Sequence, residues 1–135
     1  PKNACVLAYN MGFEKSVIKN LAGLFEDLKE ELMSIYYNIQ DLMFPFQNRF
    51  YYNKEMQGSY SIKYVLPALF PHDEELNYHN LPVVHNGSEA MSTFATLGEK
   101  SKEEQNIIRH GLLEYCKLDT LAMVKIWEKL LDVTK

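Results

Sequence analysis

The sequence predicts an α/β fold in which helices predominate around a small parallel sheet. Two short apolar runs, at about residues 4–9 and 37–43, have the composition of buried strands. A segment with helical periodicity separates them, and a strand, a helix and a strand of this length form a right-handed crossover with parallel strands. Further segments with helical character lie at 61–70, 87–97 and 102–131. The expected architecture is therefore two parallel strands and four helices.

The first expected strand is the run ACVLAY from Ala4 to Tyr9, which is short, apolar and partly β-branched. The second lies in IYYNIQDLMFPF and ends near Met43. Because two parallel strands are too few for an independent layer, we expect further strands upstream or in a partner chain. The sequence opens at Pro1 without a methionine, which suggests an excised piece. We therefore interpret residues 1–135 as a single domain that is the C-terminal fragment of a larger fold, whose first strands are missing.

The first expected helix covers about residues 12–34 and should bend around Gly23. Its apolar residues recur at helical spacing: Phe13, Val17, Leu21, Leu24, Leu28 and Leu32. Residues 48–59 lack periodicity and are expected to form a loop or a hairpin-like excursion. Ser59 or Ser61 can cap the next helix, which ends at Pro71.

Composition indicates one compact globular chain without an overall basic field. It has 135 residues, 47% hydrophobic and 13% aromatic, with a net charge of −4. This charge neither supports nor excludes a nuclease. The two cysteines are isolated and the four histidines are scattered, which argues against a disulfide and a zinc site. The sequence also lacks a secretory signal and a long apolar run, which argues against membrane insertion. We expect a cytoplasmic protein with no membrane partner.

An acid interrupts the apolar stripe of the last helix. Asp119 lies among apolar residues at helical spacing, and Tyr115 lies one turn before it on the same face. The other members of the stripe are Leu112, Cys116, Ala122, Met123, Ile126, Trp127 and Leu130. A buried carboxylate without a partner is costly, so Asp119 needs a cation, hydrogen-bond donors or an edge position near water. The structural alternative is that Asp119 caps nearby backbone or pairs with a lysine.

Three further segments contain residue types that suit nucleic-acid chemistry. Glu14 follows the first strand and could meet Asp119 in space, although an acid in the first turn of a helix is also stabilised by the helix dipole. Asp41 either faces a cleft at the end of the second strand or only terminates that strand. The loop with Arg49, Tyr52 and Lys54 mixes cations and aromatic rings, as single-strand binding surfaces do, but many solvated loops look similar.

Taken in order, AYNMGFEKSVIKNL, IQDL and LLEYCKLDTLAM resemble the later motifs of the DEDD-type 3′-to-5′ exonucleases of the RNase H-like superfamily. The family's N-x-x-F-acid turn resembles Asn10, Phe13 and Glu14, and its Tyr-x-x-x-Asp motif resembles Tyr115 and Asp119. More narrowly, YN-x-x-FE, GSYSIK, NGSEA and YC-x-x-DTLAM are similar to an uncharacterised bacterial domain-of-unknown-function family, DUF2779, thought to share that fold.

The resemblance implies a metal site. Asp119 and Glu14 would be metal ligands and catalytic residues, and Tyr115 would position the attacking water. Asn10 and Phe13 would contact single-stranded nucleic acid beside Arg49, Tyr52 and Lys54. Mg²⁺ or Mn²⁺ in the intact parent would clamp the attacking and leaving oxygens of a phosphodiester. Most members have Asp at the position of Glu14, and the family's first motif, Asp-x-Glu, has no counterpart in this sequence.

These observations lead to one expectation and two alternatives. The chain is expected to be part of a metal-dependent 3′-to-5′ exonuclease acting on DNA or RNA. With two of four carboxylates, the fragment itself should be inactive and hold no metal stably. The first alternative is a non-catalytic RNase H-like module that binds nucleic acid or protein, and the second is a structural helical domain. An exposed strand edge also predicts a homodimer.

Overall fold

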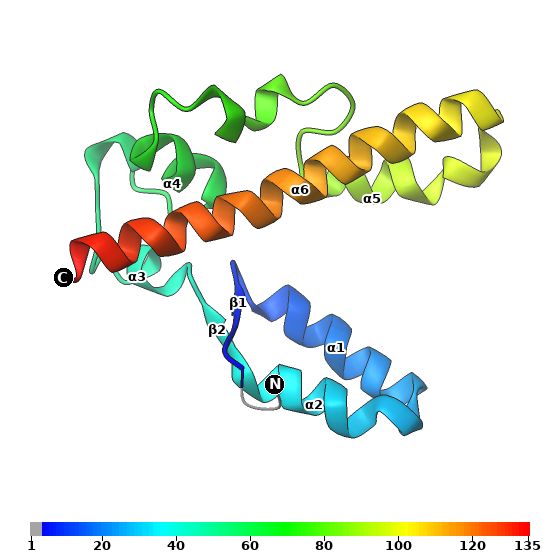
Figure 1. The fold of residues 1–135 in the computed structure, drawn as a ribbon, viewed down its shortest axis with the longest axis horizontal. Helices are drawn as coiled ribbons and strands as arrows, with labels where there is room; N and C mark the ends of the chain where they lie inside the picture. The colour runs from blue at the N-terminus through cyan, green and yellow to red at the C-terminus, as the bar shows by residue number, and fades with distance from the viewer. Residues whose placement is uncertain (1–3) are drawn as a thin grey trace. The chain divides into compact units, whose positions relative to one another are not determined.

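The computed structural model describes residues 4–135, so the opening of the chain at Pro1 lies outside the described residues. By its internal contacts the chain divides into two compact units, Pro1–Ile62 and Lys63–Lys135, each described separately below. The described residues form a helix-rich α/β structure with two parallel strands, which confirms the predicted fold class (Figure 1). The interpretation of residues 1–135 as a single domain stays a prediction.

The sheet of the first unit pairs β1 (Val6–Ala8) with β2 (Ile39–Asp41) in parallel (Figure 1). Val6 lies opposite Ile39, and Ala8 lies opposite Asp41. Both strands are shorter than the predicted 4–9 and 37–43. The second begins later because Tyr37 and Asn38 complete the preceding helix. It ends at Asp41, where the chain turns toward a further short helix.

Two helices connect the strands in place of the single long helix expected over 12–34. They are α1 (Gly12–Leu24) and α2 (Lys29–Asn38), with a 3₁₀ turn at Glu26–Leu28 between them. The helix breaks at Phe25, whose φ of −120° and ψ of 84° are not helical, close to the bend predicted around Gly23. The two helices pack side by side (Figure 1), and the Lys15 ammonium lies 5.1 Å from the ring centre of Tyr36.

The rest of the first unit is a loop held down by buried side chains. The short helix α3 (Phe44–Gln47), which the sequence analysis missed, precedes this loop. Phe46 and Met56 are buried, and Tyr51 packs edge-on against Phe46 with the ring centres 5.9 Å apart. The loop contains one 3₁₀ turn, Lys54–Met56, and no strand, so of the two predicted forms the loop is the one observed.

The second unit contains the three remaining predicted helices. They are α4 (Ile62–Leu69, whose first residue closes the first unit), α5 (Gly87–Ala95) and α6 (Lys102–Val133). The connection between α4 and α5 has only two 3₁₀ turns, Glu74–Leu76 and Tyr78–Asn80. A capping box formed by Ser101 and Glu104 starts α6. Among the described residues, no helix is sufficiently long and apolar to cross a membrane.

The buried face of α6 differs in part from the predicted apolar stripe. Its buried residues are Gly111, Leu118, Ala122 and Ile126. They recur at intervals of four and seven, as one face of a helix requires. Cys116 and Trp127 were predicted in the stripe but are exposed, because neither lies at a spacing of three, four or seven residues from Leu118 or Ala122. Tyr115 and Asp119 lie at its border and are partly buried.

Gly111 is the place where α6 tolerates no side chain. A Cβ atom built on Gly111 would lie 2.5 Å from Cβ of Val83, in the connection before α5. Cβ of Val83 is attached directly to the backbone, so relief would require the connection itself to move.

We therefore expect Gly111→Ala to destabilise the protein by about 1–3 kcal/mol, because overpacking outweighs the better helix propensity of alanine. The matched control is Gly23→Ala in α1, where a Cβ meets nothing within 4 Å. That substitution should stabilise by up to about 1 kcal/mol. Urea unfolding followed by circular dichroism measures both changes, and equal effects of the two substitutions would contradict the close packing at Gly111.

Candidate functional site

The ends of both strands are joined by the side chain of Asp41. Its Oδ1 accepts hydrogen bonds from the backbone N–H of Asn10 at 2.9 Å and of Met43 at 3.0 Å. Its Oδ2 accepts one from the N–H of Met11 at 3.0 Å. Asp41 thus lies at the carboxyl edge of the sheet and is the last residue of β2. The two roles predicted for it were to face a cleft and to terminate the strand. The three backbone bonds make it the anchor of the turn that follows β1.

That turn carries Asn10, Phe13 and Glu14. Asn10 has a left-handed backbone with φ of 66°, which Asn tolerates better than most residues. Its carbonyl accepts from the N–H of Phe13 at 3.3 Å as α1 begins. Glu14 lies in the first turn of α1 and is partly buried, where the helix dipole favours a carboxylate. Phe13 is 59% exposed and is therefore available to a ligand.

A shallow hollow lies beside this turn within the first unit. Its lining residues are Tyr9, Asn10, Met43, Gln47, Tyr60, Ser61 and Ile62. The Tyr9 hydroxyl donates to the carbonyl of Tyr60 at 2.6 Å. Burial, followed by the negative charge of Asp41, raises the pKa of Tyr9 above its usual value. Tyr9 is therefore a neutral hydrogen-bond donor at this edge of the sheet.

In the second unit, Asp119 obtains a hydrogen-bond donor from outside its own helix. The Tyr78 hydroxyl, in the connection between α4 and α5, donates to Oδ1 of Asp119 at 2.7 Å. The rings of Tyr78 and Tyr115 lie 6.0 Å apart between centres, so both tyrosines border the same carboxylate. Of the three compensations expected for Asp119, the observed one is a hydrogen-bond donor.

Both tyrosines are kept neutral by this environment. Burial first, then the hydrogen bond to Asp119 and its charge, raise the pKa of Tyr78 well above the usual range. For Tyr115, burial raises the pKa most, and the charge of Asp119 and a hydrogen bond to it add to the effect. A neutral hydroxyl donates a hydrogen bond, so each tyrosine can orient the carboxylate or a water beside it.

The predicted metal ligands fit a divalent ion in chemistry, although the set is small. Asp119 and Glu14 are hard oxygen ligands of the kind Mg²⁺ and Mn²⁺ prefer. An ionised carboxylate offers about four lone-pair sites, so the bond from Tyr78 leaves Asp119 free to ligate. Within residues 4–135, no group of three or more His, Cys, Asp or Glu side chains lies close enough to hold a metal. Glu14 and Asp119 belong to different units, so their meeting stays a prediction.

The predicted binding loop of the first unit presents its residues to solvent. Arg49 and Lys54 are exposed, and Tyr52 is 53% exposed. Arg49 has a left-handed backbone with φ of 58°, and Lys54 lies 3.7 Å from Oε1 of Glu55. Since both side chains of that ion pair are exposed, it holds Lys54 only weakly.

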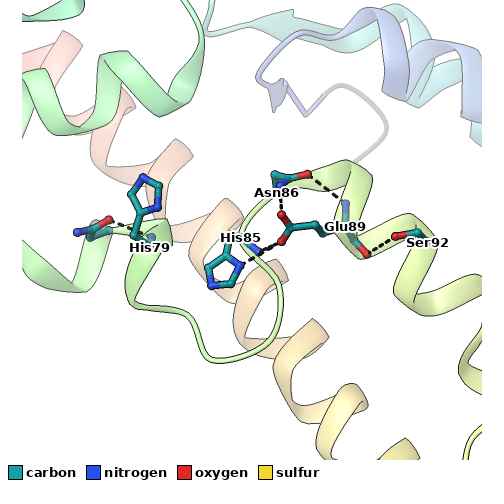
Figure 2. A network of polar contacts seen from close by, with 6 residues as sticks. His79, His85, Asn86, Glu89 and Ser92 are labelled. Carbon is teal, nitrogen blue, oxygen red and sulfur yellow. Dashed lines mark hydrogen bonds and ion pairs between the residues drawn. The ribbon is translucent and has the colours of Figure 1, made fainter.

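The motif NGSEA forms a capping network at the start of α5. Asn86 Oδ1 accepts from the N–H of Glu89 at 3.1 Å, while the Glu89 carboxylate accepts from the N–H of His85 at 2.8 Å and contacts the amide of Asn86 (Figure 2). The His85 ring nitrogen Nδ1 lies 3.1 Å from the same carboxylate. The bonds from His85, first from its backbone and then from its ring, lower the pKa of Glu89. These residues start a helix and join neither carboxylate described above.

The first unit has a counterpart among known families. Residues 1–61 match the family described as "Domain of unknown function (DUF2779)". The match covers just under half of the chain and supports the narrower resemblance for the segment with Asn10, Glu14 and Asp41. Tyr115 and Asp119 lie beyond it, and the wider resemblance to exonucleases stays a prediction. No curated protein and no solved structure matches the chain.

Tyr78 was missed by sequence reasoning. It lies 41 residues before Asp119, in a connection without periodicity, so no spacing rule links the two side chains. The only available signal was indirect, because an acid in an apolar stripe requires a donor from another segment.

Asp41 can be tested with a substitution that keeps its shape. Asp41→Asn leaves one oxygen and turns an amide N–H toward one of the three backbone donors, so we expect a loss of about 1–3 kcal/mol and faster amide hydrogen exchange at Met11. The control is Asp73→Asn, because Asp73 accepts a backbone bond from Glu75 at a turn start where Asn caps equally well. Unchanged exchange at Met11 would show that Asp41 does not hold the turn.

Tyr78→Phe should cost about 1–3 kcal/mol at neutral pH by removing the hydroxyl that bonds Asp119. Since folding raises the pKa of Tyr78, its contribution is complete below the unfolded value of about 10 and falls as the pH rises above it. Wild-type stability should therefore fall more steeply above that pH than that of Tyr78→Phe. Urea unfolding followed by Trp127 fluorescence measures the slopes, with exposed Tyr64→Phe as control. Identical slopes for wild type and Tyr78→Phe would rule out this linkage.

Proposed function

We propose that this chain carries the later half of the active site of a metal-dependent 3′-to-5′ exonuclease that acts on single-stranded DNA or RNA. Asp119 and Glu14 are two of its metal ligands, and Tyr115 orients the attacking water. The observation that carries the proposal is the cluster around Asp119, in which a partly buried carboxylate is bordered by two neutral tyrosines.

The geometry of this cluster suits the roles assigned to its members. Tyr115 lies one helical turn before Asp119, so its hydroxyl and the Asp119 carboxylate are neighbours on the same face of α6. Tyr78 donates a hydrogen bond to Oδ1 of Asp119 and so orients this carboxylate, as hydrogen-bond donors do around metal-ligating carboxylates. In the first unit, Asp41 anchors the turn that starts the helix of Glu14.

Divalent ions, when bound, would supply the clamp for the attacking and leaving oxygens of a phosphodiester. The chain's own residues would bind the ions and orient the water. The carboxylates of Asp119 and Glu14 supply negatively charged ligands, and the Tyr115 hydroxyl orients the attacking water. The sequence supplies two acidic ligands of a set that needs about four, so the family's Asp-x-Glu pair has to come from another segment.

A non-catalytic module that binds nucleic acid or protein is the second candidate. The observation that favours it is the hydrogen bond from Tyr78, because this bond stabilises the Asp119 carboxylate without a metal. In such a module, Tyr115 and Asp119 would be structural, and the exposed residues Arg49, Tyr52 and Lys54 would carry binding.

The test uses the natural protein that contains residues 1–135, at full length, with 3′-labelled and 5′-labelled single strands of DNA and RNA in Mn²⁺. We expect stepwise loss from the 3′ end. Asp119→Asn should lower the rate by at least about 100-fold. Tyr115→Phe should lower it by about 10- to 100-fold while leaving the fold intact.

Asp132→Asn is the matched control, since it makes the same chemical change on the same helix at a side chain that is 70% exposed. It should leave the rate unchanged. Cleavage that persists in Asp119→Asn would remove Asp119 from the active site. Absence of cleavage by every version, on every substrate, would overturn the exonuclease and leave the binding module.

A further inference from the structure

The first unit exposes three aromatic rings close together in sequence. Phe44 is 54% exposed, Phe50 is 75% exposed and Tyr52 is 53% exposed. The rings of Phe44 and Phe50 touch, with their centres 5.7 Å apart and their planes at 67°. This group, here termed the aromatic platform, contains two exposed rings in contact, and contiguous exposed apolar surface marks an interaction site where a single exposed ring does not.

The backbone beneath the platform is already ordered. The N–H groups of Phe50 and Tyr51 both donate to the carbonyl of Pro45, at 2.9 and 3.2 Å. The Asn48 side-chain amide donates to the carbonyl of Phe44 at 2.9 Å. Tyr51 points inward onto buried Phe46, while its neighbours on both sides are exposed. A ligand would therefore meet rings whose backbone needs little further ordering, which favours binding.

The charge around the platform favours a polyanion. Arg49 lies between the touching phenylalanines in sequence, and its left-handed backbone belongs to the same turn. From residue 42 to the end of the first unit at Ile62 the chain contains two Lys or Arg residues, Arg49 and Lys54, and a single acid, Glu55. The chain as a whole has a net charge of −4, so this stretch is a local exception. Rings beside cations match the bases and phosphates of a nucleic acid strand.

We propose that Phe44, Phe50 and Tyr52, together with Arg49, form a stacking surface for single-stranded nucleic acid. Bases stack on the exposed rings, and Arg49 neutralises a backbone phosphate. Stacking uses the face that every base has, so binding has little sequence preference. In the proposed exonuclease the platform docks the substrate strand, so this role rests on the proposed function. Binding of a strand to the platform can be measured without catalysis.

Binding is measured in EDTA by fluorescence anisotropy, with the 135-residue chain and labelled oligothymidylate and oligouridylate of about 20 nucleotides. Phe50→Ala should weaken binding by about 5- to 100-fold, and Phe44→Ala should act in the same direction. Phe94→Ala in α5 is the matched control, because Phe94 is 67% exposed and lies in the other unit. It should bind as the wild type does.

Arg49→Asn separates charge from stacking, since Asn tolerates the left-handed backbone that Arg49 adopts. It should lower the dependence of log affinity on log salt by about one. Binding in EDTA that Phe50→Ala weakens, together with no cleavage by the full-length protein in Mn²⁺, would support the platform and overturn the exonuclease, so the two proposals can fail separately.

Three results would overturn the platform. The first is no binding of either oligonucleotide by the wild type at low salt. The second is equal affinity of wild type, Phe44→Ala and Phe50→Ala. The third is a dimer, detected by light scattering, that Phe50→Ala dissociates, because the rings would then serve a second copy of the chain.

Discussion

The three hydrogen bonds accepted by Asp41 are the constraint on which the first unit depends. Two strands with three register pairs form a sheet too small to be stable by itself. The carboxylate adds bonds from Asn10, Met11 and Met43 at the edge where both strands end. Without it, the left-handed turn at Asn10 would leave backbone donors unpaired, and α1 would lose its fixed starting point. Asp41 thereby holds the start of the helix that carries Glu14.

Asp41 and Asp119 show two ways of stabilising a partly buried carboxylate. Asp41 receives backbone N–H groups, which cannot move without breaking the turn, and its role is structural. Asp119 receives the hydroxyl of Tyr78, which rotates about a single bond and can exchange partners. Only the second arrangement leaves a carboxylate whose surroundings can adapt to a ligand. For this reason the chemistry proposed here centres on Asp119, and the architecture on Asp41.

Local sequence patterns predicted most of the regular structure. The helices near 61–70, 87–97 and 102–131 are present with boundaries close to those expected, because capping residues and helical periodicity act over a single turn. Prediction was less accurate at 35–43, where Ile, Tyr and Tyr suit a strand or a helix, and the helix that precedes them continues to Asn38. The short helix α3 was missed because four residues are too few to show a period.

The sequence by itself determined the two parallel strands, the break near Gly23, the three later helices and the anomaly of an acid in the stripe of α6. It also singled out Glu14, Tyr115 and Asp119 as residues whose chemistry needs an explanation. Only the tertiary structure decided which groups meet: Tyr78 with Asp119 across 41 residues, and Asn10 with Asp41 across 31. The physical reason is that periodicity and capping depend on neighbours along the chain, whereas these bonds depend on the path of connections that have no repeating pattern.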